Sequence, residues 1–229
     1  MENTSRLVLK HKHYFEKTLL VGLPLDDLLS HFLQPVAATT WRFDIYLALH
    51  KNSNHAVTYG CELPTNKIES ILFFFPKEKD LALFWCNQFK ILKDIDVYIV
   101  GEKKSGIESF VKKYQADYSS LEKIDSACHS QLWKIRFNPP STPYIFSLDQ
   151  YFYPYQAKSI NKNTTIYTLP GVFSRRELDL GTLLLVSTFN KSDYRSWQRK
   201  SVLDFGCGAG TIAAILHPEI PSLLWDCIE

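Results

Sequence analysis

The fold is decided near the end of the chain by Val202-Leu203-Asp204-Phe205-Gly206-Cys207-Gly208-Ala209-Gly210, which continues as Thr211-Ile212-Ala213-Ala214-Ile215-Leu216. An apolar run, three closely spaced glycines and a second apolar run predict a strand, a tight turn and a helix. Because glycine lacks a Cβ atom, its backbone can lie close to a bound ligand. We therefore predict the strand–turn–helix corner of an α/β domain, with a ligand over the turn.

The spacing of these glycines separates two kinds of cofactor. A nicotinamide-binding G-x-G-x-x-G turn needs its third glycine where this chain has Thr211, which disfavours a nicotinamide-dependent oxidoreductase. Asp204 closes the strand two residues before the first glycine. This arrangement resembles motif I of the class I S-adenosylmethionine-dependent methyltransferases. A neutral turn beside an acid suits a cofactor with a cationic amine and a sulfonium rather than a pyrophosphate.

A second acid follows at the spacing expected for a Rossmann-like sheet. Residues 223–228 form an apolar run that predicts the next strand, and Glu229 comes directly after it. Glu229 lies 19 residues beyond Gly210 (229 − 210), close to the interval of about 20 residues at which such an acid binds a ribose. We expect Glu229 to accept hydrogen bonds from ribose hydroxyls.

Composition places the chain among ordinary globular proteins. Of its 229 residues 45% are hydrophobic and 22% are charged, and the formal net charge of +2 neither demands nor excludes a nucleic-acid partner. The five cysteines are scattered without a C-x-x-C pair, so we expect neither a disulfide framework nor a metal site. No stretch resembles a signal peptide or a membrane span, and a cytoplasmic location fits best.

The first part of the chain carries an α/β pattern of its own. Strands are predicted at 71–75, 97–101, 121–126 and 131–137, the last two pairing with each other, and helices at 81–92 and 105–114. Alternation of strands and helices implies a largely parallel sheet covered on both faces. The proline-rich segment 138–143 and the aromatic stretch 151–155 predict a linker. We expect one domain over 1–158 and a second over 159–229.

A further block precedes the glycine turn and makes the resemblance specific. Gly171-Val172-Phe173-Ser174-Arg175, then Leu178-Asp179-Leu180-Gly181-Thr182, then the glycine turn, resemble the ribosomal RNA small subunit methyltransferase C family. Upstream, Phe75-Pro76-Lys77 and residues 100–106 resemble the same family's N-terminal domain. The resemblance runs in order from about residue 70 to the end, whereas residues 1–60 are less distinctive.

The resemblance implies two Rossmann-like methyltransferase domains in tandem. The N-terminal domain would lack the cofactor motif and serve substrate recognition and folding, and the C-terminal domain would bind S-adenosylmethionine. The implied reaction transfers a methyl group to the exocyclic N2 of a guanine in small-subunit ribosomal RNA, with the 30S subunit as partner. The cofactor-binding residues that it implies are Asp204, Gly206, Gly208, Gly210 and Glu229, with Ser174 and Arg175 bordering the pocket.

The family's catalytic Asn/Asp-Pro-Pro-aromatic loop is the remaining expectation. Asn138-Pro139-Pro140 resembles that loop, but Ser141 stands in the aromatic position and the segment precedes the glycine turn, so we predict a linker there. We expect the family loop beyond Glu229 and hence a truncated second domain. From this we expect no methyl transfer by the 229-residue chain alone, and self-association through its incomplete sheet.

An alternative function follows from the predicted first domain. With lysine pairs at 103–104 and 112–113, a complete N-terminal domain could act as a non-catalytic RNA-binding or folding-assistant module.

Overall fold

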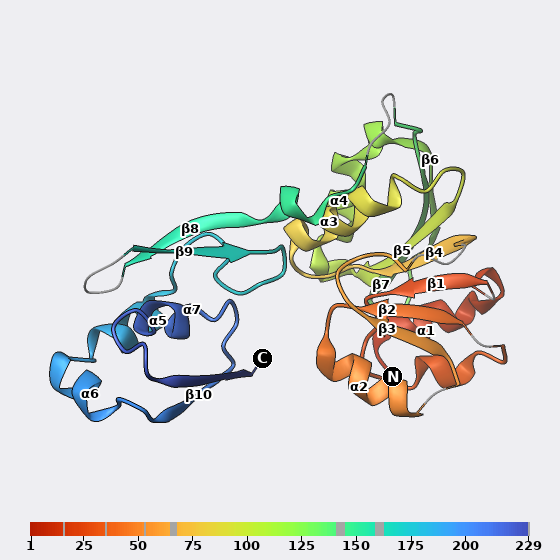
Figure 1. The fold of residues 1–229 in the computed structure, drawn as a ribbon. Coiled ribbons are helices and arrows are strands. Elements are labelled where there is room, and N and C mark those ends of the chain that lie inside the picture. Colours follow the sequence, from red (N-terminus) through yellow and green to blue (C-terminus); the bar gives the residue numbers. More distant parts are fainter. Residues whose placement is uncertain are drawn as a thin grey trace. The chain divides into compact units, whose positions relative to one another are not determined.

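The computed structural model forms two compact units, Met1–Phe146 and Ser147–Glu229 (Figure 1). It describes residues 1–15, 17–34, 36–52, 54–64, 68–140, 145–158 and 163–228. The boundary that we predicted after residue 158 falls in a hairpin of the second unit. No helix in these ranges has both the length and the apolar character needed to cross a membrane.

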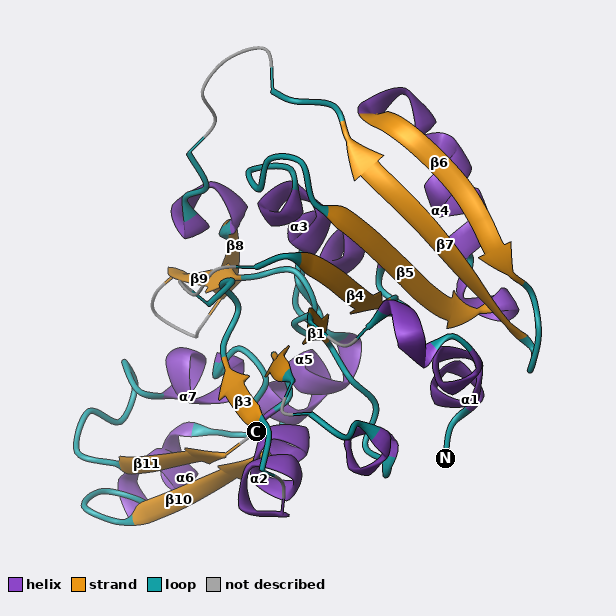
Figure 2. Ribbon diagram, turned by 90° about the vertical axis from the view of Figure 1, so that its right-hand side faces the viewer, coloured by secondary structure: helices purple, strands orange, loops and turns teal. Residues whose placement is uncertain are grey.

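The first unit is built on a seven-stranded sheet in the order β3-β2-β1-β4-β5-β7-β6 (Figure 2). Its strands are β1 Thr18–Val21, β2 Ala37–Thr40, β3 Ala56–Tyr59, β4 Ser70–Phe74, β5 Asp96–Glu102, β6 Tyr118–Asp125 and β7 Ser130–Phe137. Neighbours from β3 to β5 pair in parallel, and β7 runs antiparallel to both β5 and β6. The order 3-2-1-4-5 is that of a doubly wound Rossmann-like sheet, which confirms the predicted α/β class.

Helices cover both faces of this sheet. They are α1 Asn3–Lys10, α2 Phe43–Asn52, α3 Lys79–Phe89 and α4 Ile107–Lys113, with short 3-10 helices at Lys12–Tyr14, Leu28–His31, Lys103–Ser105 and Gln115–Asp117. On one face Leu7 of α1 and Ile45 of α2 belong to the same buried cluster as Leu72 of β4. On the other face Phe89 of α3 meets Phe73 with ring centroids 5.2 Å apart. Alternate side chains of a strand point to opposite faces, so the core has two layers.

The predicted central elements are confirmed, and one part of the chain differs from expectation. The strands at 71–75 and 97–101 appear as β4 and β5, and the last two predicted strands pair antiparallel as β6 and β7. The aromatic stretch 151–155 was wrongly predicted to be a linker. Residues 153–158 instead form a strand that pairs antiparallel with residues 163–168, and Pro154 is accommodated there.

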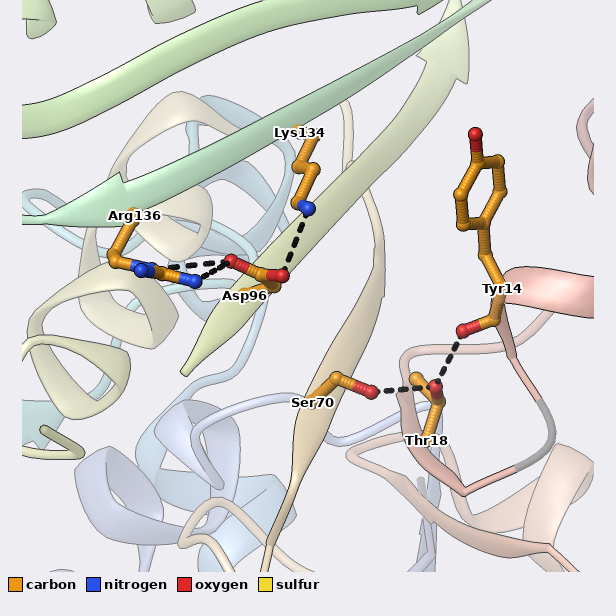
Figure 3. A network of polar contacts seen from close by, with 6 residues as sticks. All are labelled: Tyr14, Thr18, Ser70, Asp96, Lys134 and Arg136. Carbon is orange, nitrogen blue, oxygen red and sulfur yellow. Dashed lines mark hydrogen bonds and ion pairs between the residues drawn. The ribbon is translucent and has the colours of Figure 1, made fainter. Parts of the chain in front are cut away.

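Ion pairs join the start of β5 to the last part of β7 (Figure 3). The carboxylate of Asp96 accepts from Lys134 Nζ at 2.8 Å and from Arg136 Nη2 at 2.6 Å. Nearby, the hydroxyls of Thr18 and Ser70 lie 2.6 Å apart and link β1 to β4. Partial burial raises the pKa of Asp96, but hydrogen bonds from Lys134 and Arg136 outweigh it, so the net pKa lies below the usual value.

Asp96→Asn is expected to destabilise the first unit by about 1 kcal/mol at pH 7, because the pairs are partly exposed. The folded-state pKa of Asp96 is lowered, so its contribution is complete above the unfolded-state pKa of about 3.9 and disappears as the pH falls through the folded-state value. Urea unfolding at pH 7 and at pH 3 measures this difference. Glu122→Gln, an exposed carboxylate on β6, is the control. A penalty that stays constant with pH contradicts the ionic interpretation.

Candidate functional site

The second unit contains the glycine turn between two parallel strands. Its elements are the 3-10 helix Leu148–Tyr151, β8 Tyr153–Lys158, β9 Asn163–Thr168, α5 Leu180–Ser187, α6 Lys191–Ser196, β10 Ser201–Phe205, α7 Thr211–Leu216 and β11 Leu224–Ile228. The predicted strand–turn–helix corner is therefore confirmed as β10, the turn and α7. In the parallel pair Phe205 lies opposite Ile228, so both carboxyl ends meet beside the turn.

Backbone conformation explains the three glycines of this turn. Gly206, Gly208 and Gly210 have φ angles of +76°, +53° and +68°, which residues with a Cβ atom rarely adopt. Gly206 N and Cys207 N both donate to the carbonyl of Ile228, at 2.7 and 3.1 Å, and anchor the turn to β11. A Cβ atom built on any of the three glycines would have no atom of the described residues within 4 Å, apart from its chain neighbours. The turn is thus held from below and open above.

A buried acid precedes this turn on β10. Asp204 belongs to the last part of β10 and is only 7% exposed. Its register partner on β11 is Cys227, so the end of β11 lies beside it. The predicted second acid, Glu229, lies outside the described residues. Asp204 therefore lies at the end of β10 just before the three glycines, and its role in cofactor binding stays a prediction.

Of the other two predicted pocket residues, Arg175 contacts the β8–β9 hairpin. Ser174 has a φ angle of +52° and is half-buried. Arg175 donates from Nη2 to the carbonyl of Tyr151 at 3.1 Å, and its own carbonyl accepts from Thr168 Oγ1 at 2.6 Å. These contacts hold the segment against the hairpin. A role for Ser174 and Arg175 beside the cofactor stays a prediction.

A contact that the sequence did not reveal joins the hairpin to the helix after the turn. Tyr155 of β8 is 8% exposed, and its hydroxyl lies 3.1 Å from Oγ1 of Thr211, the first residue of α7. The same cluster contains Ile215 of α7 and Ala209 of the turn. Thr211, which stands where a nicotinamide-binding turn would have its third glycine, therefore links the start of α7 to the hairpin.

Tyr155→Phe is expected to destabilise the second unit by about 1 kcal/mol, because one hydrogen bond between partly buried hydroxyls is lost while the ring is kept. Urea unfolding followed by fluorescence of Trp197 and Trp225 reports on this unit once the tryptophans of the first unit are replaced. Tyr167→Phe, an exposed tyrosine on β9, is the matched control. Equal free energies of unfolding for Tyr155→Phe and Tyr167→Phe would contradict a stabilising hydrogen bond between Tyr155 and Thr211.

The proline pair that resembled a catalytic loop lies in the first unit. Asn138 N donates to the carbonyl of Asp117 at 2.9 Å, and Asn138 Nδ2 donates to the carbonyl of Ala116 at 3.0 Å. The amide therefore fastens the end of β7 to the segment before β6. This use of the side chain agrees with a structural role for Asn138.

The corresponding edge of the first unit is closed. In a doubly wound sheet the ligand crevice lies at the carboxyl ends of the strands where the order reverses, here β1 and β4. Gly22 follows β1 with a φ angle of +74°, and a Cβ atom there would lie 2.2 Å from Cη2 of Trp41, which follows β2. The indole of Trp41 also lies against Trp85 of α3, with ring centroids 5.5 Å apart. Trp41 thus fills the space above Gly22, in contrast to the open turn of the second unit.

Comparison with known proteins agrees with two methyltransferase-like units. A family described as "Methyltransferase small domain N-terminal" matches residues 5–155, more than half of the chain. The chain belongs to this family. The companion family, "Methyltransferase small domain", matches residues 163–229.

Curated relatives confirm the predicted resemblance. "Ribosomal RNA small subunit methyltransferase C" of Pseudomonas syringae pv. syringae is 34% identical over 223 residues, covering 96% of this chain and 64% of the relative. The protein of the same name from Acinetobacter baylyi is 35% identical over 237 residues, covering 97% of this chain and 66% of the relative. This member of the family therefore spans slightly less than two thirds of the length of these relatives.

A solved structure shares the fold. The T. thermophilus 16S rRNA N2 G1207 methyltransferase (RsmC), in complex with AdoMet and guanosine, superposes with a TM-score of 0.72 and 16% sequence identity. The match covers 91% of this chain and 58% of that one. At this identity the similarity establishes the fold of the family member described here.

Proposed function

We propose that this protein functions as an S-adenosylmethionine-dependent methyltransferase acting on the exocyclic N2 of a guanine in small-subunit ribosomal RNA. The observation that carries the proposal is the turn of Gly206, Gly208 and Gly210, which the described residues leave open and which follows the buried Asp204 on β10. The names of the curated relatives and the solved structure with AdoMet and guanosine support it. The closed crevice of the first unit supports a cofactor site in the second unit.

Each residue of the proposed site has a definite task. When bound, S-adenosylmethionine supplies an electrophilic methyl group on its sulfonium. The three glycines would let the ligand lie against the backbone, and Asp204 would orient its cationic amine. Glu229 would bind the ribose, and Ser174 and Arg175 would border the pocket. The exocyclic amine of guanine is a weak nucleophile, so alignment of a flipped-out base with the methyl group would supply most of the rate enhancement.

Isothermal titration calorimetry with S-adenosylmethionine tests the cofactor site. The chain should bind this ligand in preference to NADH, and Asp204→Asn should weaken binding by about tenfold or more through loss of a charge-assisted contact. Asp226→Asn, an exposed acid on β11, is the matched control. Transfer of labelled methyl groups to undermodified 30S subunits tests the reaction itself, with a protein that also carries the family's Asn/Asp-Pro-Pro-aromatic loop. Failure of the chain to bind S-adenosylmethionine would refute the proposed site.

A second candidate is an RNA-binding or folding-assistant module. Its support is the complete sheet of the first unit together with the exposed Lys103, Lys104, Lys112 and Lys113. Lysine contacts to phosphate would make binding salt-sensitive and independent of sequence. RNA binding at low salt that disappears on raising the salt, without any cofactor binding, favours this candidate over the methyltransferase.

Self-association through the second unit is a further part of the proposal. Leu203, Phe205 and Leu224 of the β10–β11 pair are 56%, 82% and 69% exposed, a large apolar surface for a sheet. Sedimentation velocity over a range of protein concentrations tests it, and a strictly monomeric chain contradicts it. We also propose a cytoplasmic location, because the proposed substrate is ribosomal RNA.

A further inference from the structure

Helix α2 and strand β3 expose a group of ring side chains at one edge of the first sheet. Along α2, Phe43, Tyr46 and His50 follow one another at the i, i+3, i+7 spacing of a single helical stripe. Tyr59 is the last residue of β3, which packs beside α2 (Figure 2). We call Phe43, Tyr46, His50 and Tyr59 the aromatic platform.

The four rings of the aromatic platform contact one another, and Tyr46 also packs, partly buried, against the core cluster. The ring centroids of Phe43 and Tyr59 are 5.3 Å apart in an edge-to-face arrangement, and those of Tyr46 and Tyr59 are 5.9 Å apart. Tyr46 and His50 stack with centroids 4.9 Å apart. The buried hydrophobic side chains of this helix are Ile45 and Leu49, whereas Phe43 and His50 are exposed.

Exposure of these rings points to a ligand. Phe43 is 48% exposed and Tyr59 is 54% exposed, which is unusual for side chains that could bury a large apolar area. Exposed aromatic side chains that are grouped, rather than scattered singly, mark interaction sites. The rings carry polar tips on Tyr46, His50 and Tyr59, so the surface is suited to a flat ligand that also offers polar edges.

The charges around the aromatic platform favour an anionic partner. Asp44, the acid on the first turn of α2, is neutralised by Arg42, whose Nε donates to Oδ1 at 3.1 Å. That hydrogen bond lowers the pKa of Asp44 and keeps the pair ionised. Lys51, one residue beyond His50, is exposed. Exposed rings on the same helix as an exposed lysine match single-stranded nucleic acid, whose bases offer flat faces and whose backbone is anionic.

We propose that the aromatic platform stacks unpaired bases of single-stranded RNA while Lys51 contacts the phosphate backbone. The identity of the RNA as ribosomal rests on the proposed function, whereas the stacking itself does not. The surface lies in the first unit, away from the glycine turn in the sequence, and so adds a second RNA contact to the one at the methyl-transfer site.

Fluorescence anisotropy of a labelled 12-nucleotide oligouridine with the full chain tests the proposal. Phe43→Ala and Tyr59→Ala should each weaken binding about tenfold, because stacking on the removed ring is lost, and should leave the salt dependence unchanged. Lys51→Gln should instead reduce the slope of log K against log salt by about 0.7, the value for one phosphate of a single strand. Tyr167→Ala, which removes a 63% exposed ring from β9 in the second unit, should bind as the wild type does.

A ring-for-ring exchange separates stacking from simple apolar contact. Tyr59→Phe keeps the ring and should retain the affinity for oligouridine. Tyr59→Leu removes the ring and should lower this affinity about as much as Tyr59→Ala does. The same strand annealed to oligoadenylate should bind weakly, because its bases are already paired. If a Tyr59 variant fails to fold, as judged by circular dichroism, Phe43→Tyr and Phe43→Leu make the same comparison on α2.

Two results overturn the proposal. Wild-type affinity of Tyr59→Leu or Phe43→Leu for oligouridine shows that the rings do not stack on bases. A change in sedimentation coefficient of platform variants, with unchanged RNA binding, identifies the surface as a protein interface instead. Calorimetry with S-adenosylmethionine distinguishes the two proposals: platform variants should bind this ligand normally, and loss of the cofactor site leaves oligouridine binding intact.

Discussion

Gly22→Ala should lower the free energy of unfolding of the first unit by about 2–5 kcal/mol, the largest effect expected for so small a substitution in this chain. Two penalties add. The φ angle of +74° disfavours any residue with a Cβ atom, and the new methyl group would lie 2.2 Å from Cη2 of Trp41. Trp41 lies against the fully buried Trp85, so it has little room to withdraw. Urea unfolding followed by tryptophan fluorescence measures the effect, with Trp197 and Trp225 replaced by phenylalanine.

Gly106→Ala is the matched control for this prediction. Gly106 belongs to the same unit and has a φ angle of +81°, but the nearest atom to its added Cβ, Lys79 Cε, is 3.5 Å away. Only the backbone penalty of about 1–2 kcal/mol should therefore appear. In a Trp41→Ala background the penalty of Gly22→Ala should fall to that of Gly106→Ala. If Gly22→Ala and Gly106→Ala lower the free energy of unfolding equally in the native background, Trp41 does not fill the space above Gly22.

Gly208→Leu should abolish binding of S-adenosylmethionine, with a loss of at least about 100-fold, while Gly208→Ala should lose about tenfold. At Gly208 no atom of the described residues beyond the chain neighbours lies within 4 Å of a built Cβ, so a longer side chain should extend into the space of the proposed ligand. Both variants carry the same strain from the φ angle of +53°. The two variants should therefore lower the free energy of unfolding of the second unit equally, as measured with urea. Calorimetry should show that they differ in affinity for S-adenosylmethionine.

Gly60→Leu controls for the effect of an added side chain elsewhere. Gly60 also has open space around its built Cβ, but it lies in the first unit after β3. Its substitution should leave cofactor affinity unchanged. If Gly208→Ala and Gly208→Leu weaken binding equally, the loss comes from backbone strain. If Gly208→Leu binds like the wild type, no ligand lies over the turn and the proposed site is wrong.

Local sequence determined the glycine turn and the central elements around it. The turn of Gly206, Gly208 and Gly210 was predictable because positive φ angles are a property of single residues. The strands β4 and β5 were predictable because long apolar runs bounded by breakers have few alternatives to a buried parallel strand. By contrast, β1, β2 and β3 span only four residues each, too few to show a periodicity.

Tertiary structure alone decided what lies beside these elements. The filling of the first crevice depends on Trp41 meeting Gly22, and the bracing of the turn depends on Tyr155 meeting Thr211, 56 positions away. Likewise, Tyr59 joins the rings of α2 only because β3 packs beside that helix. Backbone preferences act between neighbouring residues, whereas packing joins side chains whose separation along the chain carries no periodic signal. The sequence therefore determined where the glycine turn would form, and only the folded chain determined that Trp41 fills the space above Gly22 while the described residues leave the turn of Gly206, Gly208 and Gly210 open.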